Sequence, residues 1–448
     1  MRILLINPSY FSPREAAKRF QKYKQIIKSG NMYVHPFEPP LGLAMLATFL
    51  NKKGYKAKLA DMQGEYLTDE ALKRILVTYK PELVGITAMT PTVHRAIKIA
   101  GISKTSLPSV PVVMGGVHPT VDPESILTTE VVDYVIRGEG ECSFLNLLSN
   151  HLVPTTEMTG ISWKNRDGSV IITDKSPLIK NLNILPVPDY TLFPVETYID
   201  YTSKLRGIRA ISMMISRGCP YQCSFCAVSE TMGSSFRILE PEKAAQQMID
   251  LCKKFDLEGV WFKDSIFNLN PKWTISFAKY LILQKNPYKF QINTRIDLIR
   301  EKEIELLKKS GLTQIDLGIE AGTEKSLKRL NKKITLEQIR SAVKLLKQKN
   351  IDISGFFMIG IPGEDEADIQ CTFDLVRDLK LNKASVSIFT PLPGSKLYQE
   401  IMSENDACRD LKFYETHHFT ETKKSYCHVP LKRLKELHQI MNSYFVKR

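Results

Sequence analysis

The stretch RGCPYQCSFC, residues 217–226, places three cysteines on one short segment: Cys219, Cys223 and Cys226. Three thiolates at this spacing can hold three irons of a [4Fe–4S] cube. Because such clusters normally take four cysteine ligands, the fourth iron would lack a protein ligand. An open iron of this kind is available to a substrate or a cofactor. The sequence therefore predicts a cluster that binds a small molecule directly.

A zinc site and a disulfide framework are the alternative uses of these cysteines. A structural zinc needs a fourth ligand and usually draws on differently spaced CxxC pairs, and the sequence has no second CxxC. Disulfide frameworks suit small secreted chains, whereas this chain has 448 residues and begins with a strand-like run rather than a signal peptide. Three further cysteines, Cys142, Cys252 and Cys371, are expected to be buried as small hydrophobic residues.

The composition indicates a globular protein with a large core. Hydrophobic residues make up 43% of the chain, and its most apolar stretch, residues 41–50, is too short to span a bilayer. The formal net charge of +14 favours anionic partners, but the lysines are dispersed over predicted helix faces. We therefore expect a cytoplasmic protein without a transmembrane segment, and solvated helix surfaces rather than a nucleic-acid site.

The first 150 residues alternate short apolar runs with longer amphipathic ones, which is the pattern of a parallel sheet covered by helices. The expected strands are 3–6, 57–60, 83–87, 110–114 and 134–137, and the expected helices include 42–52, 69–79 and 93–103. We predict a doubly wound, Rossmann-like α/β domain over residues 1–150, whose ligand binds at the carboxyl ends of the strands. A dinucleotide is not favoured, since no GxGxxG follows the first strand.

The remaining chain divides into a connector, a second α/β domain and a tail. Residues 151–210 should contain a hairpin that turns at Asp167-Gly168, followed by a proline-rich run. Residues 211–400 should form a partial (β/α)6 barrel of the TIM type, and residues 401–448 a small helical tail. The expected strands of the barrel are 212–216, 259–262, 290–293, 314–318, 352–359 and 383–389, and its expected helices include 241–255, 300–309 and 336–349.

The CxxxCxxC segment, with Phe225 before its last cysteine, resembles the signature of the radical SAM enzymes. In that family the open iron binds the amino and carboxylate groups of S-adenosylmethionine (SAM), and an electron from the cluster cleaves SAM to a 5′-deoxyadenosyl radical. The N-terminal turns and the run Pro39-Pro40-Leu41-Gly42 are similar to the cobalamin-binding (B12-binding) domain of many members. The resemblance covers about residues 1–400 and implies three cofactors: a [4Fe–4S] cluster, SAM and cobalamin.

The resemblance implies that cobalamin lies against the turns that follow the strands of the first domain. The residues of these turns are Asn7, Pro8, Thr87, Met89, Thr90, Gly115, Gly116, His118, Gly138, Glu139 and Gly140. Paired glycines let a bulky group approach the backbone, and His118 is expected to hydrogen-bond the corrin side chains. Members that ligate cobalt with histidine carry D-x-H-x-x-G, where this chain has Asp61-Met62-Gln63-Gly64. We therefore expect a cobalt without a protein imidazole; the alternative is a domain that has lost its ligand.

In the barrel, the resemblance places SAM contacts at the strand ends. The residues are Phe225, Asp264, Arg295, Glu320, Gly360, Ile361 and Pro391. Asp264 would accept hydrogen bonds from the amino group or cap the following helix. Arg295 would pair with a carboxylate of SAM or substrate, or else with Asp297 or Glu320. Glu320 would bind the ribose hydroxyls, while the turn at Gly360 and the ring of Phe225 would lie beside adenine.

The two domains come in the order found in cobalamin-dependent radical SAM enzymes, and this resemblance implies a methyltransferase that acts on an unactivated carbon, or phosphorus, of a small molecule. The cofactors would carry the hard chemistry, and an external donor such as flavodoxin or ferredoxin would supply electrons. Oxidation, cyclisation or rearrangement with the same cofactors is the main alternative. Methylthiolation is less favoured, because those enzymes carry three more cysteines in an N-terminal domain where this chain has only Cys142. A non-catalytic corrin sensor is the alternative from another class.

Overall fold

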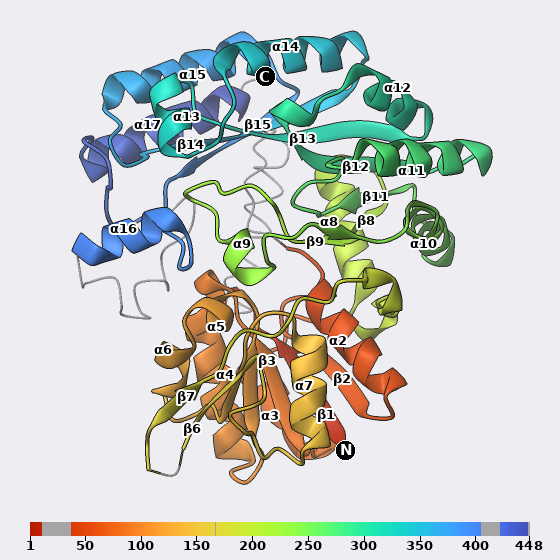
Figure 1. Ribbon diagram of the computed structural model, residues 1–448, viewed down its shortest axis with the longest axis vertical. Coiled ribbons are helices and arrows are strands. Elements are labelled where there is room, and N and C mark those ends of the chain that lie inside the picture. Colours follow the sequence, from red (N-terminus) through yellow and green to blue (C-terminus); the bar gives the residue numbers. More distant parts are fainter. Residues whose placement is uncertain (11–36, 166, 405–421, 447–448) are drawn as a thin grey trace.

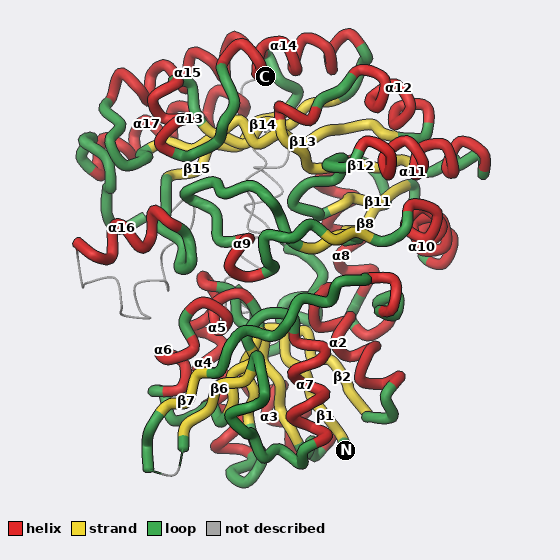
Figure 2. Tube along the Cα trace, viewed as in Figure 1, coloured by secondary structure: helices red, strands yellow, loops and turns green. Residues whose placement is uncertain are grey.

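The chain folds into two α/β domains, which lie one above the other in Figure 1. The computed structural model describes residues 1–10, 37–165, 167–404 and 422–446. Much of the predicted C-terminal tail, residues 405–421, lies outside the described residues. Figure 2 shows that strands form the centre of both domains and helices their outer layers.

The N-terminal domain is built on a seven-stranded sheet in the order β2-β1-β3-β4-β5-β6-β7. The first five strands are parallel, and β6 and β7 continue the sheet in antiparallel register. Its strands are β1 (Arg2–Asn7), β2 (Lys56–Asp61), β3 (Leu83–Thr87), β4 (Val112–Gly115), β5 (Tyr134–Ile136), β6 (Ile161–Lys164) and β7 (Val170–Ile172). Its helices are α2 (Leu41–Lys52), α3 (Asp69–Tyr79), α4 (Val93–Ser106), α5 (Val117–Val121), α6 (Pro123–Leu127) and α7 (Gly140–Ser149).

Both faces of this sheet are covered, which explains the unbroken apolar run in β1. Side chains alternate between the two faces of a strand. Ile3 and Leu5 therefore enter a core with residues of α2 and α7, whereas Leu4 and Ile6 enter a second core with residues of α3 and α4. The predicted doubly wound domain is confirmed.

The second domain is a curved sheet of six parallel strands in the order β15-β14-β13-β12-β11-β8. Its strands are β8 (Ala210–Met213), β11 (Gly259–Phe262), β12 (Lys289–Arg295), β13 (Leu312–Glu320), β14 (Asp352–Ile359) and β15 (Lys383–Ile388). Its helices are α9 (Val228–Thr231), α10 (Pro241–Lys254), α11 (Pro271–Leu283), α12 (Glu301–Lys309), α13 (Glu324–Arg329), α14 (Leu336–Gln348), α15 (Glu366–Leu379), α16 (Lys396–Glu404) and α17 (Leu431–Val446). The partial barrel is confirmed, and no helix of the described residues is long and apolar enough to cross a membrane.

The expected first barrel strand, 212–216, is interrupted in the structure. The sheet strand β8 ends at Met213, and the chain then leaves the barrel to form β9 (Ser216–Arg217), which pairs antiparallel with β10 (Arg237–Ile238). Hydrophobic patterning cannot reveal this break, because Ile215 stays buried after the strand has ended. The break directs the cysteine segment away from the sheet.

The predicted connector packs against both domains. Its hairpin forms β6 and β7 of the first sheet, and a helix that the sequence did not predict follows it, α8 (Val195–Arg206). Tyr198 on α8 donates a hydrogen bond to Asp61 Oδ2 at 2.6 Å, and the hydroxyl of Tyr190 donates to the carbonyl of Ser212 at 3.0 Å. The connector therefore fixes the end of β2 and the first barrel strand relative to each other.

Gly64 gives a direct test of this packing. A Cβ at Gly64 would lie 2.5 Å from Asp61 Oδ2 and 2.8 Å from Tyr198 Cε2, so Gly64→Ala should destabilise the protein by about 1–3 kcal/mol through overpacking. The matched control is Gly101→Ala on α4, where the nearest atom is 4.0 Å away and the substitution should stabilise by up to about 1 kcal/mol. Urea unfolding followed by circular dichroism checks both. Equal midpoints for the two variants would contradict the described packing.

Candidate active site

The three cysteines lie on the loop between β9 and α9, beyond the carboxyl end of β8. All three are half-buried free thiols. Backbone hydrogen bonds hold the loop on two sides, since the Ser224 amide donates to the carbonyl of Leu330 at 2.9 Å and the Leu397 amide donates to the carbonyl of Ser224 at 2.8 Å. The loop is thus anchored to the segments that follow α13 and β15.

The thiol environment fits a cluster better than a single metal ion. A structural zinc site needs four ligands that converge on one point, whereas this loop supplies three thiols. A cube instead spreads three thiolates over three irons. Burial raises the pKa of the Cys219 thiol, and that of Cys226 to about 11. Without iron these thiols are protonated at neutral pH, so metal binding must release protons.

Arg295, at the end of β12, contacts the cysteine loop. Its Nη1 lies 3.6 Å from Cys223 Sγ, and its guanidinium lies 3.7 Å from the centre of the Tyr221 ring. Its Nε donates to Asp297 Oδ1 at 2.9 Å and its Nη2 to the carbonyl of Lys332 at 2.6 Å. Of the pairings considered from the sequence, the structure contains the one with Asp297.

Glu320, at the end of β13, forms a buried ion pair. Its Oε1 lies 2.7 Å from Lys332 Nζ, and both side chains are at most 10% exposed. The backbone of Glu320 has a φ of 75°, in the left-handed region that is costly for a residue other than glycine. A Cβ at Gly318 would lie 2.6 Å from the Glu320 carboxylate, so this glycine makes room for the pair.

Asp264 follows β11, and its buried side chain lies against the segment that follows β8. Its Oδ1 accepts hydrogen bonds from the amides of Ile215 at 3.0 Å and Ser216 at 2.5 Å. Its Oδ2 is buried without a hydrogen-bond partner among the described residues, and burial raises the pKa of the carboxyl to about 6. The helix-cap alternative is wrong, because Asn270 caps the following helix, α11.

The turns after β14 and β15 are closely packed. Gly360 has a φ of 77°, and a Cβ there would lie 2.8 Å from Leu434 of α17. The Ile361 amide donates to Glu364 Oε2 at 3.0 Å, and burial raises the pKa of Glu364 to about 7. Pro391 is buried, whereas Phe225 is half-buried. Packing against Leu434 of α17 therefore holds the main chain at Gly360 in place.

A cavity of ≈ 1130 Å³, its open mouth included, lies at the carboxyl ends of the first sheet. Seven of the residues expected to contact cobalamin line it: Thr87, Met89, Gly115, Gly116, Gly138, Glu139 and Gly140. The second domain closes the cavity with four residues that the sequence did not single out: Met214, Arg217, Thr231 and Met232. The cavity thus lies between the first sheet and the start of the cysteine loop.

The other four expected residues do not line this cavity: Asn7, Pro8, Thr90 and His118. Asn7 Nδ2 donates to Asp61 Oδ1 at 2.8 Å. His118 is completely buried, with Nδ1 3.3 Å from the hydroxyl of Thr90, and burial lowers its pKa to about 4. The imidazole is therefore neutral at physiological pH.

Two carboxylates and two guanidiniums form a buried network beside the cavity. Arg217 donates to Glu141 through both terminal nitrogens, at 3.2 and 2.5 Å, and its Nη1 lies 3.5 Å from Glu139. Arg237 Nη1 donates to Glu139 Oε1 at 2.6 Å. Both oxygens of Glu139 are engaged, since Oε2 accepts from the Ile179 amide at 2.7 Å. Glu139 therefore faces the second domain rather than offering a free carboxylate to the cavity.

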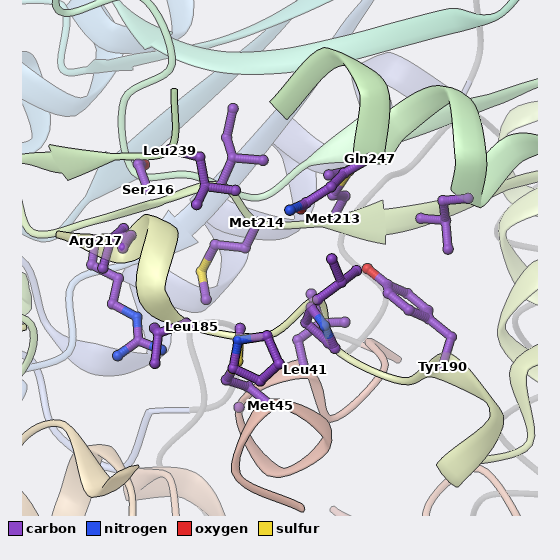
Figure 3. A pocket seen from close by; sticks show the side chains of 17 residues that line it. Leu41, Met45, Leu185, Tyr190, Met213, Met214, Ser216, Arg217, Leu239 and Gln247 are labelled. Atoms are coloured by element: carbon purple, nitrogen blue, oxygen red, sulfur yellow. The ribbon is translucent and has the colours of Figure 1, made fainter. Parts of the chain in front are cut away.

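A smaller cavity of ≈ 720 Å³, its open mouth included, adjoins the first one and shares Gly42, Met214 and Arg217 with it. Figure 3 shows Met45 and Leu41 of α2 on one side of this space and Met213 and Met214 on the other. Tyr190 and Leu185 of the connector complete its wall. Arg217 therefore lies at the junction of the two spaces, with Gly42 and Met214.

Comparison with known proteins assigns both domains. Residues 213–376 match the model of the radical SAM superfamily, and residues 32–148 match that of the B12 binding domain. The chain is 32% identical over 371 residues to the uncharacterized methyltransferase PH0819 of Pyrococcus horikoshii, which covers 82% of this chain and 79% of that protein. The chain belongs to the cobalamin-dependent radical SAM enzymes.

Two further proteins are similar to this radical SAM enzyme, one in sequence and one in fold. It is 30% identical over 410 residues to the anaerobic magnesium-protoporphyrin IX monomethyl ester cyclase of Rubrivivax gelatinosus, with 90% of this chain and 70% of that protein covered. Its fold matches the radical SAM methyltransferase TsrM of Kitasatospora setae, solved with cobalamin and a [4Fe–4S] cluster. The TM-score is 0.72 at 18% identity, over 90% of this chain and 75% of that one.

The residues present fit the cofactors of the family: a [4Fe–4S] cluster, SAM and cobalamin. The fit rests on the three thiols of one loop, on the orphaned Oδ2 of Asp264 and on the glycine-lined cavity. At Gly116 a Cβ would meet Thr87 Oγ1 at 2.8 Å and the φ is 104°, so glycine is needed to form that wall.

Among the other cysteines, Cys252 is buried as expected, but the expectation for Cys142 and Cys371 is wrong because both are exposed on helix surfaces.

Removal of one thiol separates the two cofactor sites. Cys223→Ala, reconstituted without oxygen, should lose cluster absorption and reduce SAM cleavage to background, while corrin uptake stays near wild type because no cysteine of the loop lines the large cavity. The control is Cys371→Ala at an exposed position, which should keep both the cluster with its SAM cleavage and the uptake of corrin. Iron content, absorption spectra and 5′-deoxyadenosine formation measure the effects, and SAM cleavage by Cys223→Ala at the control rate would contradict the assignment.

Proposed function

We propose that this enzyme transfers a methyl group from SAM to an unactivated carbon, or phosphorus, of a small molecule. One observation carries the proposal: Met214 and Arg217, which lead into the cysteine loop, also line the cavity at the carboxyl ends of the first sheet. When bound, the cluster supplies the electron that cleaves SAM, and cobalamin carries the methyl group. The Pyrococcus horikoshii relative is named a methyltransferase, which supports this reaction.

The barrel residues would orient SAM on the open iron. The buried, orphaned Oδ2 of Asp264 is suited to accept a hydrogen bond from the amino group. Glu320 would bind the ribose hydroxyls while keeping its bond to Lys332. The main chain at Gly360, Ile361 and Pro391 would contact adenine next to the ring of Phe225.

The first domain would hold the corrin by shape and by backbone rather than by a cobalt ligand. Gly115 and Gly116 on one side, and Gly138 and Gly140 on another, leave the cavity wall without side chains. Thr87 and Met89 line the same space. Met214 and Met232 from the second domain are apolar and would keep water from the reacting face.

Cyclisation, oxidation or rearrangement with the same cofactors is the second candidate. It is favoured by the 30% identity to a protein named as a cyclase, over 90% of this chain. The residues described above would hold SAM and corrin for either reaction, so the fate of the methyl group distinguishes the two reactions.

We assign the supply of electrons to an external low-potential donor of the flavodoxin or ferredoxin class, and the enzyme to the reducing environment of the cytoplasm. Pro220 and Gln222 are the exposed residues of the cysteine loop, and Lys396 Nζ lies 3.3 Å from Gln222 Oε1. Lys333 is exposed two residues after Asn331, whose side-chain amide donates to the carbonyl of Gln222 at 2.6 Å. These cations favour a donor with an acidic surface.

Methyl-labelled SAM tests the proposed function. The reconstituted enzyme is incubated without oxygen with SAM that carries a deuterated methyl group, a chemical reductant and a small-molecule extract of cells. We expect a product that gains the labelled methyl, together with S-adenosylhomocysteine and 5′-deoxyadenosine, and none of these with Cys223→Ala. A product that forms with 5′-deoxyadenosine but without label would refute methyl transfer in favour of the second candidate.

A further inference from the structure

Arg295, at the end of β12, contacts two residues of the cysteine loop. Its Nη1 lies 3.6 Å from Cys223 Sγ, and the face of its guanidinium covers the ring of Tyr221 at 3.7 Å. The hydroxyl of Tyr221 in turn donates to Asp297 Oδ2 at 3.3 Å. Arg295 and Asp297 therefore hold both a cluster ligand and the residue midway between the first two cysteines.

Most N–H groups of the guanidinium already donate hydrogen bonds within the protein. Its Nε donates to Asp297 Oδ1 at 2.9 Å, and its Nη2 donates to the carbonyl of Lys332 at 2.6 Å and lies 3.4 Å from Asp297 Oδ2. Its side chain is only 6% exposed. These contacts use four of the five N–H groups of the guanidinium. A SAM carboxylate that accepted from two of them would have to displace at least one bond, so a role on the cysteine loop suits this geometry better.

A hydrogen bond to a ligand sulfur changes the reduction potential of an iron–sulfur cluster. The reduced cluster carries one more negative charge than the oxidised one. A cationic donor on a ligand sulfur therefore stabilises the reduced form and makes it easier to reach. The effect is strengthened by burial, because a low local dielectric screens the charge less.

We propose that Arg295 is a positioning residue that acts through Cys223 to raise the reduction potential of the cluster. The step is a one-electron reduction by the external donor, in which no bond is made or broken. Asp297 opposes the effect with its negative charge and also orients the guanidinium. The inference depends on the cluster alone and stands or falls independently of methyl transfer.

The midpoint potential of the reconstituted cluster, followed by EPR without SAM, tests the proposal. Arg295→Gln should shift the equilibrium towards the oxidised form by about tenfold, which is 59 mV for one electron. Arg295→Lys should shift it less in the same direction. Asp297→Asn should shift it in the opposite direction, because it removes a negative charge while the guanidinium keeps its bond to Lys332.

The opposite signs exclude a purely structural role, in which both variants would lose iron or shift alike. Arg300→Gln is the matched control, since Arg300 pairs with Glu303 on the neighbouring segment and should leave the potential unchanged. An unaltered potential in Arg295→Gln, combined with weaker SAM binding in a titration, would overturn the proposal and restore Arg295 as a SAM ligand. If Arg295→Gln takes up no cluster, unshifted potentials in Arg295→Lys and Asp297→Asn overturn it equally.

Discussion

Four buried charges join the two domains of this enzyme, and the location of its active site depends on them. Glu139 and Glu141 belong to the turn after β5 and to α7, whereas Arg217 and Arg237 belong to β9 and β10. Loss of one partner from a buried pair leaves an uncompensated charge and costs about 3–5 kcal/mol. The network therefore holds the start of the cysteine loop firmly against one wall of the cavity.

This arrangement places the two candidate ligand sites, the cysteine loop and the large cavity, at one interface. Strands β1 to β5 of the first sheet and all six strands of the second are parallel, and parallel strands bind ligands at their carboxyl ends. Thr87, Gly115 and Gly138 mark those ends in the first sheet, and Met214 follows directly after β8. Because both ends face the interface seen in Figure 1, residues on either side of the cysteine loop, Met214 and Arg217 before it and Thr231 and Met232 after it, also line the large cavity.

Much of this could be predicted from sequence, because strands and turns are local features. The apolar runs predicted the bounds of the strands to within a few residues, and the cysteine spacing predicted which loop would hold the cluster. The partners of the charged residues could not be predicted, since Glu139 meets Arg237 across 98 positions of chain. Likewise His118 follows a glycine pair like a ligand contact, but its ring turns into the core beside Thr90. Whether the side chain of a turn residue faces the cavity or the core depends on tertiary packing, which a local sequence pattern does not predict.

The central claim is that corrin and cluster occupy neighbouring sites at one interface. EPR of a single sample that holds both the paramagnetic cob(II)alamin form and the reduced cluster tests it most directly. We expect magnetic coupling between the two centres, seen as broadened signals and as faster relaxation of the cobalt signal than in Cys223→Ala. A spectrum equal to the sum of the two separate centres would contradict it.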